Sequence, residues 1–254
     1  MILEDYIEPG SYDAAFWMAG VYDDEFPIDE LGDVSLEVSR KLRTLAITVL
    51  VSSGKSNGFF HNLIRSGRAR HRYLSRCAAE NRLDDHHRSS GRVSPLMDTI
   101  ASGDHDLARR IVDLSPAEWM QGHEYEDDYC YAQLVHCLLS GDDGRGPNLL
   151  ERFTRFTEGE PNARLDVSRA LISRAQNDFD EAFEQMLRQQ EHAIAANKAR
   201  GELEEPHVIA NRRIFIEGLA ILRLAEKVGL KTEEEYLFCP SIARIPMTEP
   251  FPGE

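Results

Sequence analysis

Apolar residues recur at spacings of three and four along most of the chain, and this periodicity predicts an all-α protein. No run of alternating β-branched residues is long enough to indicate a sheet. We therefore expect packed antiparallel helices, at about residues 35–53, 59–64, 68–82, 93–101, 104–114, 124–140, 148–157, 162–176, 178–200 and 207–228.

Short local signals add detail to this pattern. Residues 115–118 (SPAE) have the N-cap, first-turn proline and third-position glutamate of a helix start, and Asn177 is expected to cap the helix after it. Residues 207–228 are apolar around most of the helix circumference, which predicts the central, most buried helix. The prolines of residues 236–254 predict an extended tail over the surface.

Length and composition indicate a globular chain, long enough for one large domain or two small ones. At 254 residues and 42% apolar content, the chain can bury a sizeable core. The sequence of residues 102–108 is similar to that of residues 176–182, and this internal similarity favours stacked helical hairpins. We expect a single all-helical domain over residues 1–254, made of an acidic N-terminal segment (1–34), a helical body (35–235) and an extended proline-rich tail (236–254).

Charge is distributed unevenly along a chain whose net charge is -15. Residues 1–34 hold ten acidic residues and no lysine or arginine, whereas residues 35–92 hold twelve basic and four acidic residues. We expect the acidic segment to pack against this basic stretch; alternatively, an acidic surface steers a cationic partner. The negative balance argues against nucleic acid as a direct partner, because phosphate binding needs a basic surface.

Location follows from what the chain lacks. No stretch of eighteen apolar residues is present, and the first residues are acidic where a secretory signal would be basic. The four cysteines form no C-x-x-C pair, and we expect them to be buried free thiols. These features predict a soluble, cytoplasmic protein that does not contact the membrane.

Motifs for catalysis are missing from the sequence, which contains no nucleophile elbow, P-loop, dinucleotide-binding glycine pattern or H-E-x-x-H. Two histidines follow two aspartates in residues 84–87 (DDHH), but adjacent histidines point apart on most backbones and no second cluster has ligand spacing. We therefore expect no cofactor, no metal and no enzymatic activity. The alternative is a metal-dependent hydrolase that uses His86, His87, His105, Asp106 and nearby acids.

Four carboxylates surround two tyrosines in residues 124–129 (EYEDDY), the most unusual local feature of the chain. The acids can favour the positive end of a helix and pair with the arginines of residues 65–92. They can act as general acids or bases, although paired carboxylates alone specify no reaction. They can also form a binding face, in which tyrosines supply contact area and acids meet the lysines and arginines of a partner.

Several stretches in chain order carry a family resemblance: residues 14–20 (AAFWMAG), 85–88 (DHHR), 124–128 (EYEDD), 163–166 (ARLD), 179–183 (FDEAF), 217–220 (EGLA) and 235–240 (EYLFCP). Together they resemble the immunity protein 49 family of bacterial polymorphic toxin systems. The resemblance spans almost the whole chain without a single diagnostic motif. It implies an all-α protein that stays in the cytoplasm of the producing cell and neutralises a cognate toxin by binding it.

Such toxins are commonly nucleases or other enzymes that act in the cytosol, delivered by contact-dependent or type VI secretion. We predict that an acidic, tyrosine-bearing face covers a basic active-site cleft of the toxin. A tetratricopeptide-like scaffold that binds a peptide in a concave groove is the alternative binding protein. The oligomeric state stays open. The predicted toxin contacts are Glu124, Tyr125, Glu126, Asp127 and Asp128, together with Asp23, Asp24 and Glu25.

Overall fold

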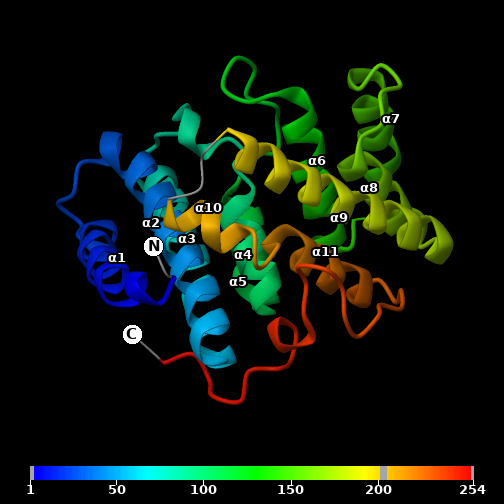
Figure 1. Ribbon diagram of the computed structural model, residues 1–254. Coiled ribbons are helices and arrows are strands. Elements are labelled where there is room, and N and C mark those ends of the chain that lie inside the picture. Colours follow the sequence, from blue (N-terminus) through cyan, green and yellow to red (C-terminus); the bar gives the residue numbers. More distant parts are fainter. Residues whose placement is uncertain (1–2, 143, 201–204, 253–254) are drawn as a thin grey trace.

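The fold is all-α, as the periodicity predicts. The computed structural model describes residues 3–142, 144–200 and 205–252, and in these ranges it contains no β-strand. Figure 1 shows the helices, which in chain order are η1 (Leu3–Tyr6), α1 (Ile7–Tyr22), α2 (Ile28–Ser53), α3 (Ser56–Ala79), η2 (His86–Arg88), α4 (Ser94–Ser102), α5 (His105–Leu114), α6 (Glu126–Ser140), α7 (Gly146–Phe156), α8 (Ala163–Ser173), α9 (Gln176–Ala199), α10 (Pro206–Asn211), α11 (Ile216–Lys227) and η3 (Ser241–Ala243).

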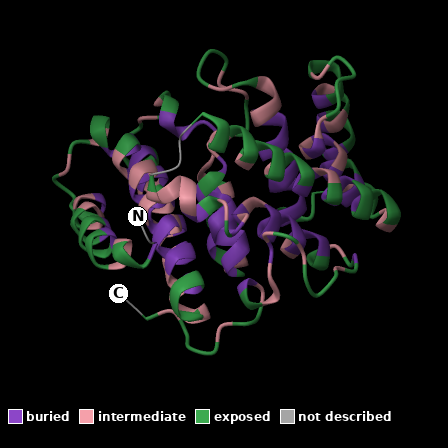
Figure 2. Cartoon of the chain, viewed as in Figure 1, coloured by how far each residue is buried: buried purple, intermediate pink, exposed green. Residues whose placement is uncertain are grey.

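Helix α4 lies between two groups of helices, with α1 to α3 on one side and α6 to α9 on the other (Figure 1). It packs against α3, against α11 and against its chain neighbour α5. Every residue of α4 except Ser94 is buried, and the purple centre of Figure 2 includes this helix. The most completely buried helix is therefore α4, and not the segment 207–228 that the apolar pattern favoured.

The end of the chain returns to the N-terminal helices. Helix α10 packs on α2 and on η1. Further on, the tail lies against α3, where the side chain of Asn57 bonds both the hydroxyl and the backbone N–H of Thr248. Phe251 packs there beneath Arg68, whose guanidinium carbon is 4.3 Å from the ring centroid. The tail includes the 3-10 helix η3, so it is not extended throughout.

Ion pairs hold the acidic N-terminal segment against the basic stretch, which confirms the packing expected from the charge distribution. In addition to the ion pairs, Arg76 of α3 donates hydrogen bonds to two backbone carbonyls of the acidic segment, those of Asp23 and Phe26, at 3.2 and 2.9 Å. These contacts place α1 and the turn after it on α2 and α3. The side-chain pairs are Asp13 with Lys41, Asp24 with Arg72 and Asp29 with Arg82.

Three helices differ from the prediction, two of them because of small residues. Helix α1 was not predicted, since its buried positions are Gly10, Ala14 and Val21, which give only a weak apolar stripe. Helix α3 is unbroken where the pattern placed two helices, because Gly67 lies at the contact with α4 and not in a turn. Helix α2 also begins at Ile28, seven residues before the predicted start at 35.

Three further boundaries differ, two of them because side chains or distant backbone supply the hydrogen bonds. Residues 115–118 do not start a helix; the carbonyls of Pro116 and Ala117 instead accept hydrogen bonds from side chains of α6. Asn177 does not cap α9, since the helix already begins at Gln176 and Ala175 is at its N-cap. The predicted helix 207–228 is divided into α10 and α11, and the backbone N–H of Phe215 between them donates to the carbonyl of Phe238.

The contact between α3 and α4 has room only for glycine at position 67. A Cβ on Gly67 would overlap Thr99 Oγ1 and lie 3.2 Å from a methyl carbon of Leu107. Next to it, the buried carboxylate of Asp98 accepts from Arg43 Nε at 2.6 Å and from Ser66 Oγ at 2.5 Å. These contacts fix how α2, α3 and α4 sit relative to one another.

Replacement of Gly67 by alanine tests this close contact. Helix propensity alone predicts that Gly67→Ala raises the free energy of unfolding by about 1 kcal/mol. We expect the opposite, a loss of about 1–3 kcal/mol, because the added methyl group forces α3 and α4 apart. Urea denaturation of the two proteins measures the difference, and a stabilised variant would show that the helices can separate without cost.

A buried histidine makes the stability of the fold depend on pH. Burial, together with the nearby positive charges of Arg145 and Arg70, lowers the pKa of His136 to about 3. Its pKa in the unfolded chain is about 6.5. Between these two values the unfolded chain binds a proton that the folded protein does not, so acid destabilises the fold.

We expect His136 to lower the free energy of unfolding by up to about 1.4 kcal/mol for each pH unit below 6.5, until the pH reaches its pKa in the folded protein. His136→Gln removes this titration. Urea denaturation between pH 7.5 and 4.5 should therefore show a shallower loss of stability in the variant than in the wild-type protein. Parallel pH profiles would show that His136 is protonated in the folded state as readily as in the unfolded chain.

Candidate functional site

The turn before α6 is organised by the side chain of Glu124. Its carboxylate accepts hydrogen bonds from the backbone N–H of Gly91, at 2.6 Å, and from the backbone N–H of Met120, at 3.0 Å. Its backbone carbonyl accepts from Trp119 Nε1 at 3.3 Å. Glu124 therefore joins the turn to the loop before α4, and its negative charge is used within the fold.

Two more of the predicted contact residues form ion pairs inside the protein. Glu126 lies 2.5 Å from Arg152 Nε of α7. Asp128 lies 3.2 Å from Arg164 of α8, whose guanidinium also bonds both carboxylate oxygens of Glu217 in α11, at 2.7 and 2.9 Å. Burial raises the pKa of Asp128, and Arg164 offsets only part of that shift.

Tyr125 and Asp127 are the members of the acidic run that stay available to a partner. Tyr125 is 76% exposed at the N-cap of α6. The side chain of Asp127 makes no hydrogen bond or ion pair with another residue that the structure describes, and it lies on the first turn of the helix. An exposed tyrosine beside an unpaired carboxylate offers both contact area and charge.

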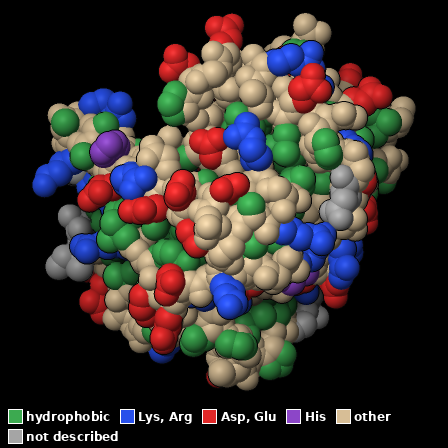
Figure 3. Space-filling model, turned by 90° about the vertical axis from the view of Figure 1, so that its right-hand side faces the viewer, with side chains coloured by type: hydrophobic (Ala, Val, Ile, Leu, Met, Phe, Trp, Pro, Cys, Tyr) green, Lys and Arg blue, Asp and Glu red, His purple; other side chains and the backbone are tan. Residues whose placement is uncertain are grey.

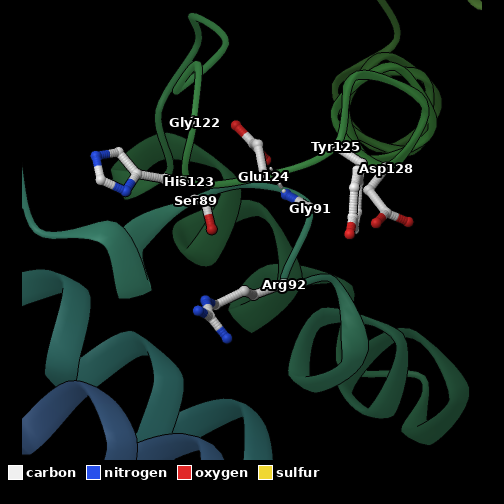
Figure 4. Close-up of a pocket in the computed structure, with 8 residues that line it drawn as sticks. All are labelled: Ser89, Gly91, Arg92, Gly122, His123, Glu124, Tyr125 and Asp128. Atoms are coloured by element: carbon white, nitrogen blue, oxygen red, sulfur yellow. Dashed lines mark hydrogen bonds between the residues drawn. The ribbon is translucent and has the colours of Figure 1, made fainter.

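A cavity of about 600 Å³ opens beside these residues. Tyr125 and Asp128 lie at one end of it and His123 at the other, with Glu124 and Gly91 between them (Figure 4). The remaining lining residues are Ser89, Arg92 and Gly122. Sequence reasoning did not find this cavity, because its walls come from two segments about thirty residues apart that carry no shared motif.

Arg92 is the cation of the cavity wall. Its side chain extends below the loop that carries Ser89 and Gly91 (Figure 4). The Nε atom is buried and makes no hydrogen bond within the part of the chain that the structure describes. The wall therefore combines an arginine with the carboxylates of Glu124 and Asp128, so polar side chains of either charge can be bound there.

Asp23, Asp24 and Glu25 lie elsewhere, in the turn between α1 and α2. Asp24 pairs with Arg72 of α3 although its own side chain is 87% exposed, and Asp23 Oδ1 accepts from the backbone N–H of Glu25 at 2.9 Å. This turn contacts α3, whereas the acidic run of α6 contacts α7 and α8. The structure does not join the two acidic groups through direct contacts.

The histidines of the chain are arranged differently from the sequence-based expectation. His86 and His87 do not point apart; their ring centroids are 3.8 Å apart. His123 lies next to them, with its ring centroid 5.9 Å from that of His86. His105 instead lies at the start of α5, where burial and the positive charges of Lys227 and Arg223 lower its pKa. The histidines of the hydrolase alternative are thus divided between two environments.

Comparison with known proteins identifies the family. A family model described as "Immunity protein 49" matches residues 33–243, which include the cavity and the whole acidic run of α6. The chain belongs to the immunity protein 49 family. No curated protein and no solved structure matches the chain.

Membership in the immunity protein 49 family implies that the chain neutralises a toxin and has that toxin as its partner. Family membership also indicates a binding protein and not an enzyme, in agreement with the expectation from the sequence. Residues 23–25 precede the matched region, whereas residues 85–88 and 124–128 lie inside it. Among the described residues, no helix has the length and apolar character needed to cross a membrane.

Substitution of two neighbouring acids separates structural from free carboxylates. Glu124→Ala leaves the N–H groups of Gly91 and Met120 without their acceptor, so we expect the free energy of unfolding to fall by about 1–3 kcal/mol. Asp127→Ala should lower the free energy of unfolding by at most about 1 kcal/mol, which is the stabilisation that one negative charge near a helix N-terminus provides. Urea denaturation measures both changes, and equal losses would show that Glu124 contributes no more to the fold than Asp127 does.

Proposed function

We propose that this immunity protein neutralises its toxin by binding over the toxin's active site, in the cytoplasm of the cell that makes it. The observation that carries the proposal is the family match over residues 33–243, which includes every residue that lines the cavity. The resemblance of the chain to immunity proteins of polymorphic toxin systems favours a toxin delivered by contact-dependent or type VI secretion. No catalytic step is required of the immunity protein itself.

The binding face that we propose centres on Tyr125 and Asp127. Tyrosine is enriched among the residues that dominate protein interfaces, because its ring buries a large area at low entropic cost. The cavity beside Tyr125 can receive a side chain of the toxin, with Arg92 or Asp128 as its polar partner. Glu124, Glu126 and Asp128 support this face from within, and Asp23, Asp24 and Glu25 are proposed as a second acidic patch.

The partner that this face fits is a basic protein. Residues 93–254 hold seventeen basic and thirty acidic residues, so the part of the chain that bears Tyr125 is negatively charged. A nuclease is a suitable toxin, since its cleft must be cationic to bind phosphates. The face in Figure 3, which includes α7 and α8, instead shows acidic, basic and apolar side chains interspersed, and it offers no surface of one sign.

The experiment that tests neutralisation is co-expression with the toxin-like gene beside the gene for this protein. Survival of the host and co-purification of a stoichiometric complex are the expected results. Toxicity without rescue, and without a complex, would exclude that pair. A complex that forms with a short toxin peptide as tightly as with the folded toxin would favour the peptide-binding scaffold over occlusion of an active site.

Variants of the complex then locate the interface. Tyr125→Ala should weaken binding by about 2 kcal/mol, roughly thirtyfold, as expected for a central interface tyrosine. Asp127→Asn should slow association and make it less sensitive to salt, because it removes a steering charge. Surface plasmon resonance at 50 and 300 mM NaCl measures both effects.

Glu181→Gln is the matched control, since Glu181 is an exposed acid on the far face of α9 from the core. It should leave the affinity and the salt dependence almost unchanged. If rescue occurs but Tyr125→Ala and Asp127→Asn bind like the control, toxin neutralisation stands and the proposed face is wrong.

A further inference from the structure

Asp85, His86 and His87 bring three potential metal ligands together in the loop between α3 and α4, outside the face proposed for the toxin. One ligand atom from each residue lies within 4.8 Å of the others. The side chain of Asp85 is 8% exposed, that of His87 is 6% exposed and that of His86 is 51% exposed. The cluster therefore has two members with little side-chain exposure, of which only His87 is a buried residue, and one member that solvent can reach.

The distances in the cluster suit a tetrahedral ion. Ligand atoms about 2.0–2.1 Å from a tetrahedral Zn²⁺ ion lie roughly 3.3 Å from one another. Asp85 Oδ1 is 3.2 Å from His87 Nδ1, which already matches this separation. The same oxygen is 3.9 Å from His86 Nδ1, and the exposed ring of His86 is free to move by the remaining few tenths of an ångström.

A carboxylate on the other side of His87 completes the arrangement found around metal-binding histidines. His87 Nε2 lies 2.8 Å from Asp33 Oδ1, so in the tautomer that carries its proton on Nε2 the ring donates to Asp33 and Nδ1 keeps a lone pair for a metal. The ring is also held by packing, because a Cβ on Gly32 would lie 2.6 Å from its atoms. His87 is thus oriented as a ligand by α2.

We propose that Asp85, His86 and His87 bind one divalent transition-metal ion, of which Zn²⁺ is the representative, and that His123 supplies the fourth ligand. Imidazole and carboxylate are suitable ligands for Zn²⁺. The ring of His123 lies 5.9 Å from that of His86, centroid to centroid, within reach after side-chain rotation. The ion ties the loop before α4 to the turn before α6, and these two segments form the walls of the cavity.

Calorimetric titration of the full-length, chelator-treated protein with ZnCl₂ tests the site. We expect one Zn²⁺ per chain and a melting temperature that rises with Zn²⁺ concentration, since the ion binds only the folded form. His86→Ala and Asp85→Asn should each weaken Zn²⁺ binding by at least about tenfold. Asparagine keeps an oxygen for the backbone N–H of His87, so Asp85→Asn retains the local turn.

His192→Ala is the matched control, because His192 is an exposed histidine on α9 and its loss should leave Zn²⁺ affinity unchanged. Circular dichroism of the metal-free variants shows that each is folded before Zn²⁺ is added. Binding of less than one equivalent by the wild-type protein, or equal affinity in His86→Ala, Asp85→Asn and His192→Ala, would overturn the site. Wild-type affinity in His123→Ala would overturn the assignment of the fourth ligand.

Discussion

The close approach of α3 and α4 at Gly67 is the contact on which the arrangement of the other helices depends. Helix α4 is the element that connects the α2 and α3 hairpin to α11, and it is buried along nearly all of its length. A side chain at position 67 would overlap Thr99, so only glycine lets the two helices meet at this distance. Helix α11, which packs on α4, is therefore positioned relative to α3 through this contact.

The same contact contains a charge that the core must accommodate. Burial raises the pKa of Asp98, and the pairing with Arg43 and the hydroxyl of Ser66 opposes that shift. A buried ion pair adds little net stability, because the desolvation of both charges offsets their attraction. Its effect is on specificity: Asp98 has its partners in only one register of α2, α3 and α4. The glycine sets the distance between the helices, and the carboxylate sets their alignment.

Sequence periodicity identified the helices that have one clear apolar stripe and failed where burial involves small residues. Helix α5 was predicted at nearly its observed bounds, because Leu107, Ala108 and Ile111 alternate with charged residues. Helix α1 was missed, since its buried positions are mainly glycine and alanine. The division between α10 and α11 could not be predicted either, because it depends on a hydrogen bond to Phe238 in the distant tail.

The candidate site was only partly visible in the sequence, because a sequence shows charges but not their partners. Glu124 bonds a residue 33 positions away, and Asp128 pairs with an arginine 36 positions away. These contacts leave Tyr125 and Asp127 as the accessible part of a run that looked uniformly acidic. Function, in turn, came from the diffuse family resemblance, which the match over residues 33–243 confirms, and not from any catalytic motif.

The charge distribution explains why a negative surface remains after folding. Residues 1–34 bring ten acids and residues 35–92 an excess of eight positive charges, and the structure pairs these segments directly. The first 92 residues are therefore nearly neutral as a unit. Most of the net charge of -15 belongs to residues 93–254, where the cavity and Tyr125 are found. Long-range attraction of a cationic partner thus acts toward the part of the molecule that carries the proposed face.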